Sequence, residues 1–309
     1  MGRFVARRLL QMIPVFLGTT ALIFFMVRVL PGDPVAAMWG DKAPDPAQLA
    51  AFKHRLGLDL PMWQQYLNYM GDLFTGNFGE TMSGRQVIDV ISEALPVTVR
   101  LALMAFAIEI VFGVGIGLLA GLKRGKLADK GTLVFTLVLI SIPVPVLGYI
   151  FQNVFATQLG WVTPTVPVNS DKWIDLLLPA IVLGSLSLAY VARLSRTSIV
   201  ENIKADYIRT AIAKGLPRRK VIGTHLLRNS MIPVVTFLGT DLGALMGGAI
   251  VTEGIFNVKG VGNALFRAIN QKEGATVVGF VVVLVIVYLV ASLIVDLLYA
   301  VLDPRIRYA

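Results

Sequence analysis

Cysteine is absent from the 309-residue sequence, and histidine occurs only twice, at His54 and His225. Without cysteine, disulfides, thiolate catalysis and Cys-based zinc or iron–sulfur sites are excluded. The two histidines lie far apart in the sequence, which does not support a multi-histidine metal site. The sequence also has no Ser-His-Asp arrangement and no H-E-x-x-H motif. We therefore predict no metal site, no catalytic residue and no enzyme activity for this chain.

Charged residues are scarce as well, at 15% of the chain, whereas a soluble domain carries about 25%. Hydrophobic residues make up 56%, and the mean hydropathy is +0.73. This balance indicates that lipid surrounds much of the chain. The net charge of +9 does not indicate nucleic-acid binding, because the basic residues lie between hydrophobic runs, where they set membrane topology.

Six long apolar runs organise the sequence. Each approaches or exceeds the ~20 residues that a helix needs to cross a ~30 Å hydrocarbon core. Helix is the expected state, because lipid cannot satisfy a backbone donor or acceptor. We therefore predict an all-α polytopic membrane protein with about six transmembrane helices. The runs are residues 9–27, 95–122, 133–156, 174–194, 231–251 and 277–302.

Lys and Arg concentrate in alternate connections between these runs. The positive-inside rule places those connections, and both termini, in the cytoplasm, in agreement with an even number of spans. The first run resembles a secretory signal but is longer, and no small-x-small cleavage site follows it, so we expect an uncleaved span. The basic residues on this side are Arg3, Arg7, Arg8, Lys123, Arg124, Lys126, Lys130, those from Arg193 to Arg228, Arg305 and Arg307.

This topology predicts a division of the chain into four parts. The second part is a small extracytoplasmic cap whose residues 63–70 have apolar side chains at helical spacing. The cap suits packing against the spans or docking of an external partner, and both interpretations stay open. The parts are residues 1–30 (N-terminus and first span), 31–94 (cap), 95–302 (five-span core with a basic cytoplasmic loop at 195–230) and 303–309 (cytoplasmic tail).

Small residues recur on helical faces inside two runs. Gly239, Gly243 and Gly247 lie four apart in the fifth run, a spacing that lets two helix backbones approach closely. Such a face suits helix packing, or a surface that separates in a transport cycle. Prolines at 143 and 145 permit a kink in the third run. The second run carries a similar set of glycines, Gly113, Gly115, Gly117 and Gly121.

Acidic residues inside the runs are a second unusual feature. Glu109 lies well inside the second run and Asp241 near the middle of the fifth. An acid at the centre of a membrane helix costs about 2.5–3.5 kcal/mol on insertion scales. Such residues face the bundle interior or a water-filled cavity. Glu109 and Asp241 therefore either lock two helices together or line a translocation path.

The cytoplasmic loop contains a short helix signature. Residues 206–214 are good helix formers, with Asp206 near the start and Lys214 near the end, as the helix dipole favours. Gly215 is placed to stop the helix, and Pro217 discourages its continuation. We predict a short helix parallel to the membrane. Its basic, amphipathic character is also compatible with resting on anionic lipid.

This loop resembles the conserved cytoplasmic EAA loop of ABC importer permeases. Residues 206–216 match the D-Y-x-R-T-A-x-A-K-G-L form that is typical of the peptide and nickel branch. Arg209 and Thr210 stand where the generic motif has Glu and the first Ala, a departure shared by that branch. Further matches follow in order along nearly the whole chain: Leu30-Pro31-Gly32-Asp33-Pro34, Leu56-Gly57-Leu58-Asp59, Leu227-Arg228-Asn229, Glu253-Gly254-Ile255-Phe256, Gly260-Val261-Gly262 and Leu302-Asp303-Pro304.

The resemblance implies the type I importer permease fold in a bacterial inner membrane. It implies a subunit that translocates di- or oligopeptides, delivered by an extracytoplasmic solute-binding protein, together with a second homologous permease and two cytoplasmic ABC ATPases. ATP and Mg would belong to those ATPases, because this chain has no G-x-x-x-x-G-K-[ST] loop. The residues implied to couple to an ATPase are Asp206, Tyr207, Arg209, Thr210, Ala211, Lys214, Gly215 and Leu216.

Two alternatives stay open at this point. The same machinery could import nickel or haem, since in this family selection rests largely with the binding protein. From another class, an ion-coupled secondary transporter could use Glu109 and Asp241 as proton carriers. The sequence shows no inverted repeat of hydropathy, which many secondary transporters have.

Overall fold

The computed structural model describes residues 2–29, 47, 50, 54, 59–81, 83–167, 170 and 172–302. Within these ranges the chain is helical apart from turns and an isolated β-bridge between Glu80 and Gln86. The predicted all-α class is therefore confirmed. Much of the predicted cap before residue 59, and the predicted tail 303–309, lie outside the described residues.

The described helices give four candidate spans, or six if each of two bent helix pairs is counted as one span. Four are long and apolar enough to cross a membrane unbroken, and two more are pairs of helices with a bend between them. The unbroken spans are α1 (Gly2–Val29), the continuous α4–η2–α5 (Val87–Ile108, Glu109–Val114, Gly115–Leu122), η4–α8 (Trp173–Leu176, Leu177–Asn202) and α14 (Gly274–Leu302).

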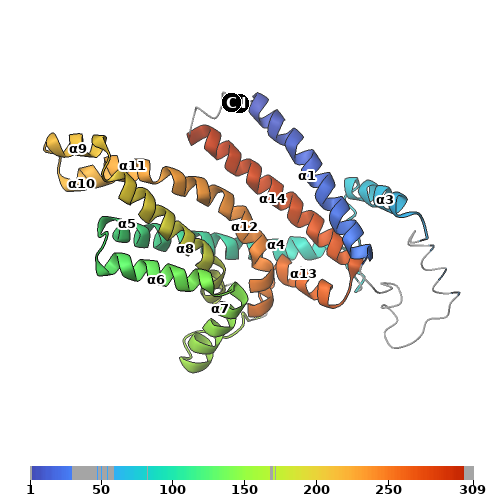
Figure 1. The fold of residues 1–309 in the computed structure, drawn as a ribbon. Helices are drawn as coiled ribbons and strands as arrows, with labels where there is room; N and C mark the ends of the chain where they lie inside the picture. Colours follow the sequence, from blue (N-terminus) through green and yellow to red (C-terminus); the bar gives the residue numbers. More distant parts are fainter. Residues whose placement is uncertain are drawn as a thin grey trace.

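The third predicted run is divided rather than straight. The helix α6 (Leu127–Ser141) meets α7 (Val144–Phe151) and the π-helical turn η3 (Gln152–Gln158) at an angle of 105°. Proline disfavours helical geometry at the residue before it, and Ile142 accordingly has ψ 123°. The kink that Pro143 permits is therefore present, and it turns α7 away from α6 (Figure 1).

The fifth predicted run is bent near its start. The short segments α10 (Arg218–Lys220), η5 (Val221–Leu226) and α11 (Leu227–Ser230) meet α12 (Ile232–Phe256) at 50°. Pro233 lies in the first turn of α12, where its missing amide hydrogen costs nothing. The loop after α12 leads to α13 (Val261–Asn270), a short helix that packs on α12, α14 and α4.

The central helix is α8, which packs against α4, η2, α5, α6, α7 and α12. Small side chains make this possible, because they let several helices approach one axis. Four small residues of α8 are fully buried: Ala180, Ala189, Ala192 and Ser195. A Cβ built on Gly184 would lie only 3.0 Å from the Ala105 carbonyl oxygen. Movement of α8 would therefore reach most of the bundle.

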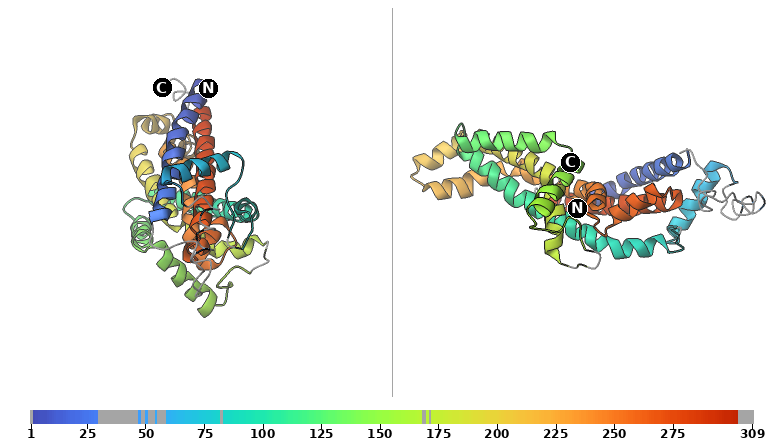
Figure 2. Two further views of the ribbon diagram at one scale, coloured as in Figure 1. Left: turned by 90° about the vertical axis from the view of Figure 1, so that its right-hand side faces the viewer. Right: turned by 90° about the horizontal axis from the view of Figure 1, so that it is seen from below.

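The two ends of the molecule differ in character. At one end α3 (Met62–Phe74) packs on α1, where Tyr66 and Tyr69 lie 5.4 and 5.6 Å from the Phe24 ring and the Tyr66 hydroxyl lies 2.9 Å from that of Thr20. At the opposite end lie α9 (Asp206–Ala213) and α10, as Figures 1 and 2 show. The helices α1 and α14 run side by side between these ends.

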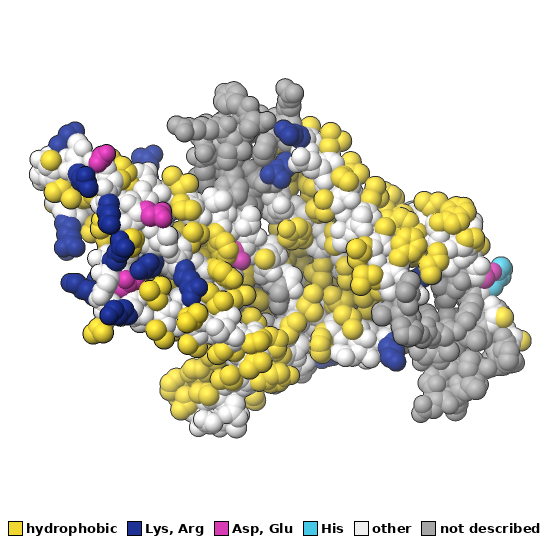
Figure 3. Space-filling view, in the orientation of Figure 1, with side chains coloured by type: hydrophobic (Ala, Val, Ile, Leu, Met, Phe, Trp, Pro, Cys, Tyr) yellow, Lys and Arg dark blue, Asp and Glu magenta, His cyan; other side chains and the backbone are white. Residues whose placement is uncertain are grey.

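The two ends also differ in their basic side chains. In the view of Figure 3, most Lys and Arg side chains gather at the end formed by α9, α10 and the connection between α5 and α6, while hydrophobic side chains cover much of the remaining face. The exposed apolar residues include Val134, Leu137 and Tyr149 of α6 and α7. Such a surface is expected where lipid or another membrane protein replaces water.

Candidate functional site

The helix α9 presents an exposed polar face at the basic end of the molecule. Only Ile208 and Ala211 turn inward, at 2% and 5% exposure, and they pack on Ile199 of α8 together with Val221 and Leu226. The other side chains that sequence analysis assigned to this loop stay accessible. They are Asp206, Tyr207, Arg209, Thr210, Lys214 and Gly215, with Leu216 half-buried.

The end of α9 is a complete Schellman motif. Gly215 has φ +74°, in the left-handed region that glycine adopts without strain. Its amide donates to the Ile212 carbonyl at 2.9 Å, and the Leu216 amide donates to the Ala211 carbonyl at 3.3 Å. The helix that sequence analysis predicted here, and its stop at Gly215, are therefore present. The role of the loop residues remains a prediction.

Hydrogen bonds connect α9 to the end of the central helix. The Tyr207 hydroxyl donates to the side-chain oxygen of Asn202, the last residue of α8, at 2.8 Å. The Asn202 side-chain amide donates to the Ser198 carbonyl at 2.9 Å, and the Ser230 hydroxyl donates to the same carbonyl at 3.4 Å. Together with the apolar contacts below α9, these bonds make α9, α8 and α11 one connected unit.

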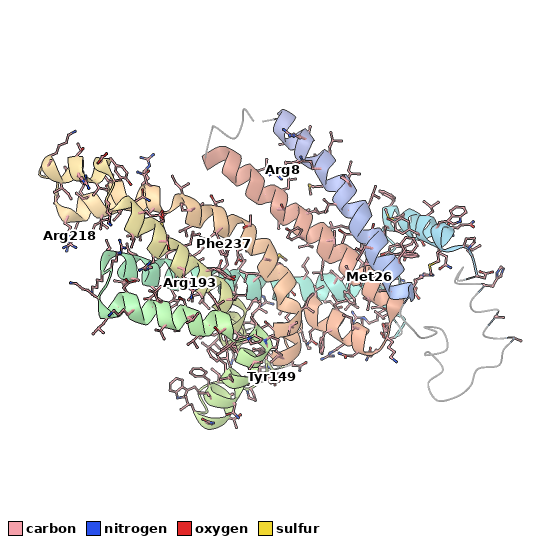
Figure 4. All side chains as sticks on the ribbon, in the orientation of Figure 1. Arg8, Met26, Tyr149, Arg193, Arg218 and Phe237 are labelled. Atoms are coloured by element: carbon pink, nitrogen blue, oxygen red, sulfur yellow. The ribbon has the colours of Figure 1, made fainter. Side chains whose placement is uncertain are left out.

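A bidentate ion pair then ties α8 to α6. The Arg196 guanidinium donates to both carboxylate oxygens of Asp129, at 2.7 and 3.0 Å, and the Gly125 amide donates to the same carboxylate at 2.8 Å. One turn earlier, Arg193 donates to the Thr136 hydroxyl at 3.0 Å; Figure 4 labels Arg193 on α8. Bidentate geometry fixes orientation as well as distance. The pair cannot be foreseen from the sequence, because its members lie 67 residues apart.

Three glycines of the second span pack closely on α8. A Cβ built on Gly117 would lie 2.5 Å from the Ala192 carbonyl oxygen, while one on Gly113 or Gly121 would lie 2.8 Å from a side chain of α8. These three glycines lie four apart, so they form one face of η2 and α5 that rests on α8. By contrast, Gly115 has open space, because it points away from that face.

The glycine face of α12 is packed only in part. A Cβ on Gly243 would lie 3.0 Å from the Tyr288 ring of α14, whereas Gly247 is exposed with open space around it, and Gly239 is half-buried. Within the described part of the chain this face therefore brings no second helix backbone against Gly247. Its exposed portion remains free for lipid, a partner or a path.

The two acids of the spans come together from different helices. Glu109 begins the π-helical turn η2 and is fully buried, and Asp241 of α12 is 9% exposed. Asp241 and the Ser187 hydroxyl of α8 approach the Glu109 carboxyl without forming a hydrogen bond of good geometry. Both Glu109 oxygens and Oδ2 of Asp241 are buried without a partner. Sequence analysis selected both residues but did not foresee that they meet.

A third buried carboxylate, that of Glu253, organises the turn after α12. Its two oxygens accept hydrogen bonds from the Thr98 hydroxyl of α4 at 2.7 Å and from the Asn263 amide at 2.9 Å. The Thr98 hydroxyl also accepts the Val261 amide at 2.9 Å. The carboxylate fits because Gly260 has no side chain, since a Cβ there would lie 2.2 Å from it. The first turn of α13 is thus capped from two other helices.

The described residues contain no group of three or more His, Asp or Glu side chains that could hold a metal ion. In the segment before α3, His54 lies 2.6 Å from the Asp59 carboxylate, whose hydrogen bond raises the pKa of His54. Both side chains are exposed, so this pair is an ordinary surface contact rather than a site.

Comparison with known families identifies two matching regions. Residues 113–308 match the model of the binding-protein-dependent transport system inner membrane component, and residues 1–102 match the model of the N-terminal part of such membrane components. Among solved structures, a chain of a methionine ABC transporter in inward-facing conformations superposes with a TM-score of 0.54 at 15% identity. That match covers 70% of this chain and 97% of the solved one, and it shows a shared fold.

Curated relatives match along the whole chain. The di/tripeptide transport system permease protein of Pseudomonas aeruginosa is 39% identical over 332 aligned residues, covering 99% of this chain and 98% of the relative. The dipeptide transport system permease protein of Escherichia coli is 38% identical, covering 100% and 99%. The glutathione transport system permease protein of Escherichia coli is 35% identical and covers all of both chains.

Proposed function

The chain belongs to the family of binding-protein-dependent transport system inner membrane components, and on that premise we propose that it imports di- or oligopeptides. It is a multi-pass inner-membrane permease subunit of an ABC importer. The observation that carries the substrate is what the relatives that match along the whole chain transport. Their substrates, dipeptides, di- and tripeptides and glutathione, are all short peptides.

We propose that the working assembly has four further subunits. A second homologous permease would complete the membrane part, two cytoplasmic ATPases would bind ATP and Mg, and a solute-binding protein would deliver the peptide from outside. The family description, which names a binding protein, supports this assembly. So does the absence of a phosphate-binding loop motif from the sequence, which assigns ATP hydrolysis to other chains.

The proposed orientation places both termini and the end that carries α9 and α10 in the cytoplasm. The Lys and Arg side chains gathered at that end support it through the positive-inside rule. The opposite end, with α3 and the predicted cap 31–94, would then face the binding protein. We also propose that the less buried part of the α12 glycine face, with Gly239 half-buried and Gly247 exposed, lies toward the path or the second permease.

We propose α9 as the element that an ATPase moves. Its exposed residues Tyr207, Arg209, Thr210 and Lys214 would contact a groove of the ATPase, with Asp206, Ala211, Gly215 and Leu216 shaping the helix and its turn. The attachments of α9 to Ile199 and Asn202 support this role, because force on α9 would pass directly to the central helix.

Uptake of labelled dipeptides by cells with and without this gene tests the proposed function. We expect deletion to abolish the ATP-dependent part of dipeptide uptake, and a plasmid copy to restore it. Unchanged dipeptide uptake in the deletion strain would contradict the substrate assignment. Uptake of nickel and haem, measured in the same strains, would then show whether the same machinery carries one of those substrates.

Replacing Gly215 by valine should uncouple the permease from its ATPases. A β-branched residue at φ +74° is strained by about 1–2 kcal/mol, enough to distort the turn in most molecules. We therefore expect ATPase retention on the purified permease, and ATP-dependent uptake, to fall about tenfold. Immunoblotting of membranes should show normal insertion, because the space around Gly215 is open.

The matched control is Gly125→Val. Gly125 has φ +79° and open space, and it lies in the other basic connection, between α5 and α6. The two variants therefore carry similar backbone strain at the same end of the molecule. ATPase retention should fall in Gly215→Val alone. Equal losses in both variants would show that strain anywhere at this end disturbs assembly, and would remove α9 from the coupling role.

A further inference from the structure

Two carboxyl groups inside the bundle lack the partners that buried acids normally have. Among the described residues, Glu109 of η2 and Asp241 of α12 form no ion pair. They approach each other and the Ser187 hydroxyl, yet three of their four oxygens are buried without a hydrogen bond of good geometry. An unmet buried acceptor carries a desolvation cost that a hydrogen-bond donor can recover. The pair can therefore receive a further donor, best a cationic one, which the described residues do not supply.

The two acids differ in how deeply they are buried. Asp241 is the outer member, at 9% exposure, and Glu109 lies behind it with none. Phe237 lies one helical turn before Asp241, so the two share a face of α12. The Phe237 ring lies 6.2 Å from the Tyr190 ring of α8, which is 46% exposed. The acids thus lie next to an aromatic pair between α8 and α12.

The basic residue of α8 nearest in sequence to this pair bonds elsewhere. Arg193 is the base of α8 closest in sequence to Ser187 and Tyr190, and its guanidinium is directed to Thr136 of α6. In Figure 4, Arg193 and Phe237 are labelled on the neighbouring helices α8 and α12. A cation that meets the carboxyl pair would therefore have to come from outside the described chain.

We propose that Asp241, backed by Glu109, binds the protonated α-amino group of the peptide during its passage, an inference that rests on the proposed function. Short peptides of different sequence share an ammonium group, a carboxylate and amide bonds. A permease that accepts many of them can recognise only those shared groups. An ammonium offers three donors to the unpartnered carboxyl oxygens, and the Tyr190–Phe237 pair offers an apolar contact to the first side chain.

The test compares a peptide with its N-acetylated form, which lacks the charge. The complete transporter in proteoliposomes is supplied with labelled dialanine or N-acetyl-dialanine, each at a concentration that saturates the binding protein. The maximal transport rate for dialanine should exceed that for the acetylated peptide about tenfold. This is the ratio expected when one hydrogen bond to a charged group is lost. In Asp241→Asn the two rates should become nearly equal.

Further variants separate recognition from folding. Asp241→Glu keeps the carboxylate and should keep the preference for dialanine. Asp89→Asn removes an exposed carboxylate at the start of α4 and should also keep the preference for dialanine. Glu109→Gln tests the inner member if Asp241→Asn does not assemble, and it should reduce the preference in the same direction.

Two results would overturn the inference while leaving the proposed function intact. One is equal transport of both peptides by the wild type, and the other is an unchanged preference in Asp241→Asn and Glu109→Gln. Transport of neither peptide by the wild type would instead overturn the proposed function, and this inference with it.

Discussion

Replacing Gly117 by alanine should destabilise the isolated permease by about 1–3 kcal/mol, the usual cost of inserting a methyl group into a well-packed site. The new Cβ would lie 2.5 Å from the Ala192 carbonyl oxygen and 2.6 Å from Cβ of Ser195. Neither neighbour can rotate away, because one is backbone and the other is fixed to it. Since α8 contacts most other helices, a shift there should spread through the bundle.

The measurement is the thermal melting temperature of the detergent-purified protein, with Gly115→Ala as its control. Gly115 lies two residues earlier in the same span with open space around it. Alanine there removes the helix penalty of glycine, about 0.5–1 kcal/mol, and should leave the melting temperature unchanged or raise it. If both variants melted at the same temperature, close packing at Gly117 would not be a source of stability.

The glycines show which parts of the helix packing the sequence predicts and which parts it does not. Spacing of four predicts close helix packing in both the second and the fifth runs, and nothing in the pattern ranks one above the other. The structure gives the close contact to Gly113, Gly117 and Gly121, because α8 runs along that face, and leaves Gly247 open. Which helix lies opposite a glycine face depends on tertiary contacts, which hydrophobic periodicity does not contain.

Span positions and local turns were predictable for simpler reasons. Burial in lipid requires long apolar helices, so hydropathy located the four unbroken candidate spans and the two bent helix pairs. The stop at Gly215 follows from a local rule for helix ends. Hydropathy could not foresee the π-helical turns, such as the one that begins at Glu109, because they depend on a shift in hydrogen bonding rather than on composition.

The candidate site also has one part that the sequence predicts and one part that it does not. The loop 206–216 could be located from its residues alone, whereas its connections could not. The Arg196–Asp129 pair and the Thr98–Glu253 bond join residues 67 and 155 positions apart. Glu253, Gly260 and Gly262 stood out in the sequence only as part of a resemblance. The structure supplies their physical reason, since the two glycines leave room for the buried carboxylate.

Replacing Glu253 by alanine should have its largest effect where α4, α12 and α13 meet. The Thr98 hydroxyl and the Asn263 amide would lose their acceptor in a fully buried position, at about 1–3 kcal/mol for each unsatisfied group. The first turn of α13 would then lose a cap that fixes it to α12. We expect a large fall in the melting temperature of the purified protein, and faster hydrogen exchange of amides in α13.

Two valine variants test whether hydrogen bonding, rather than volume, causes this effect. Thr98 and Thr252 are both fully buried, but the Thr98 hydroxyl bonds to Glu253 and Val261, whereas that of Thr252 has no partner. Thr98→Val should therefore lower the melting temperature, and Thr252→Val should leave it unchanged or raise it. Because Thr98 and Glu253 share one bond, the double variant Thr98→Val/Glu253→Ala should lose less stability than the two single losses combined. Strict additivity would mean that the two residues act separately, and would contradict a shared bond as the source of their effects.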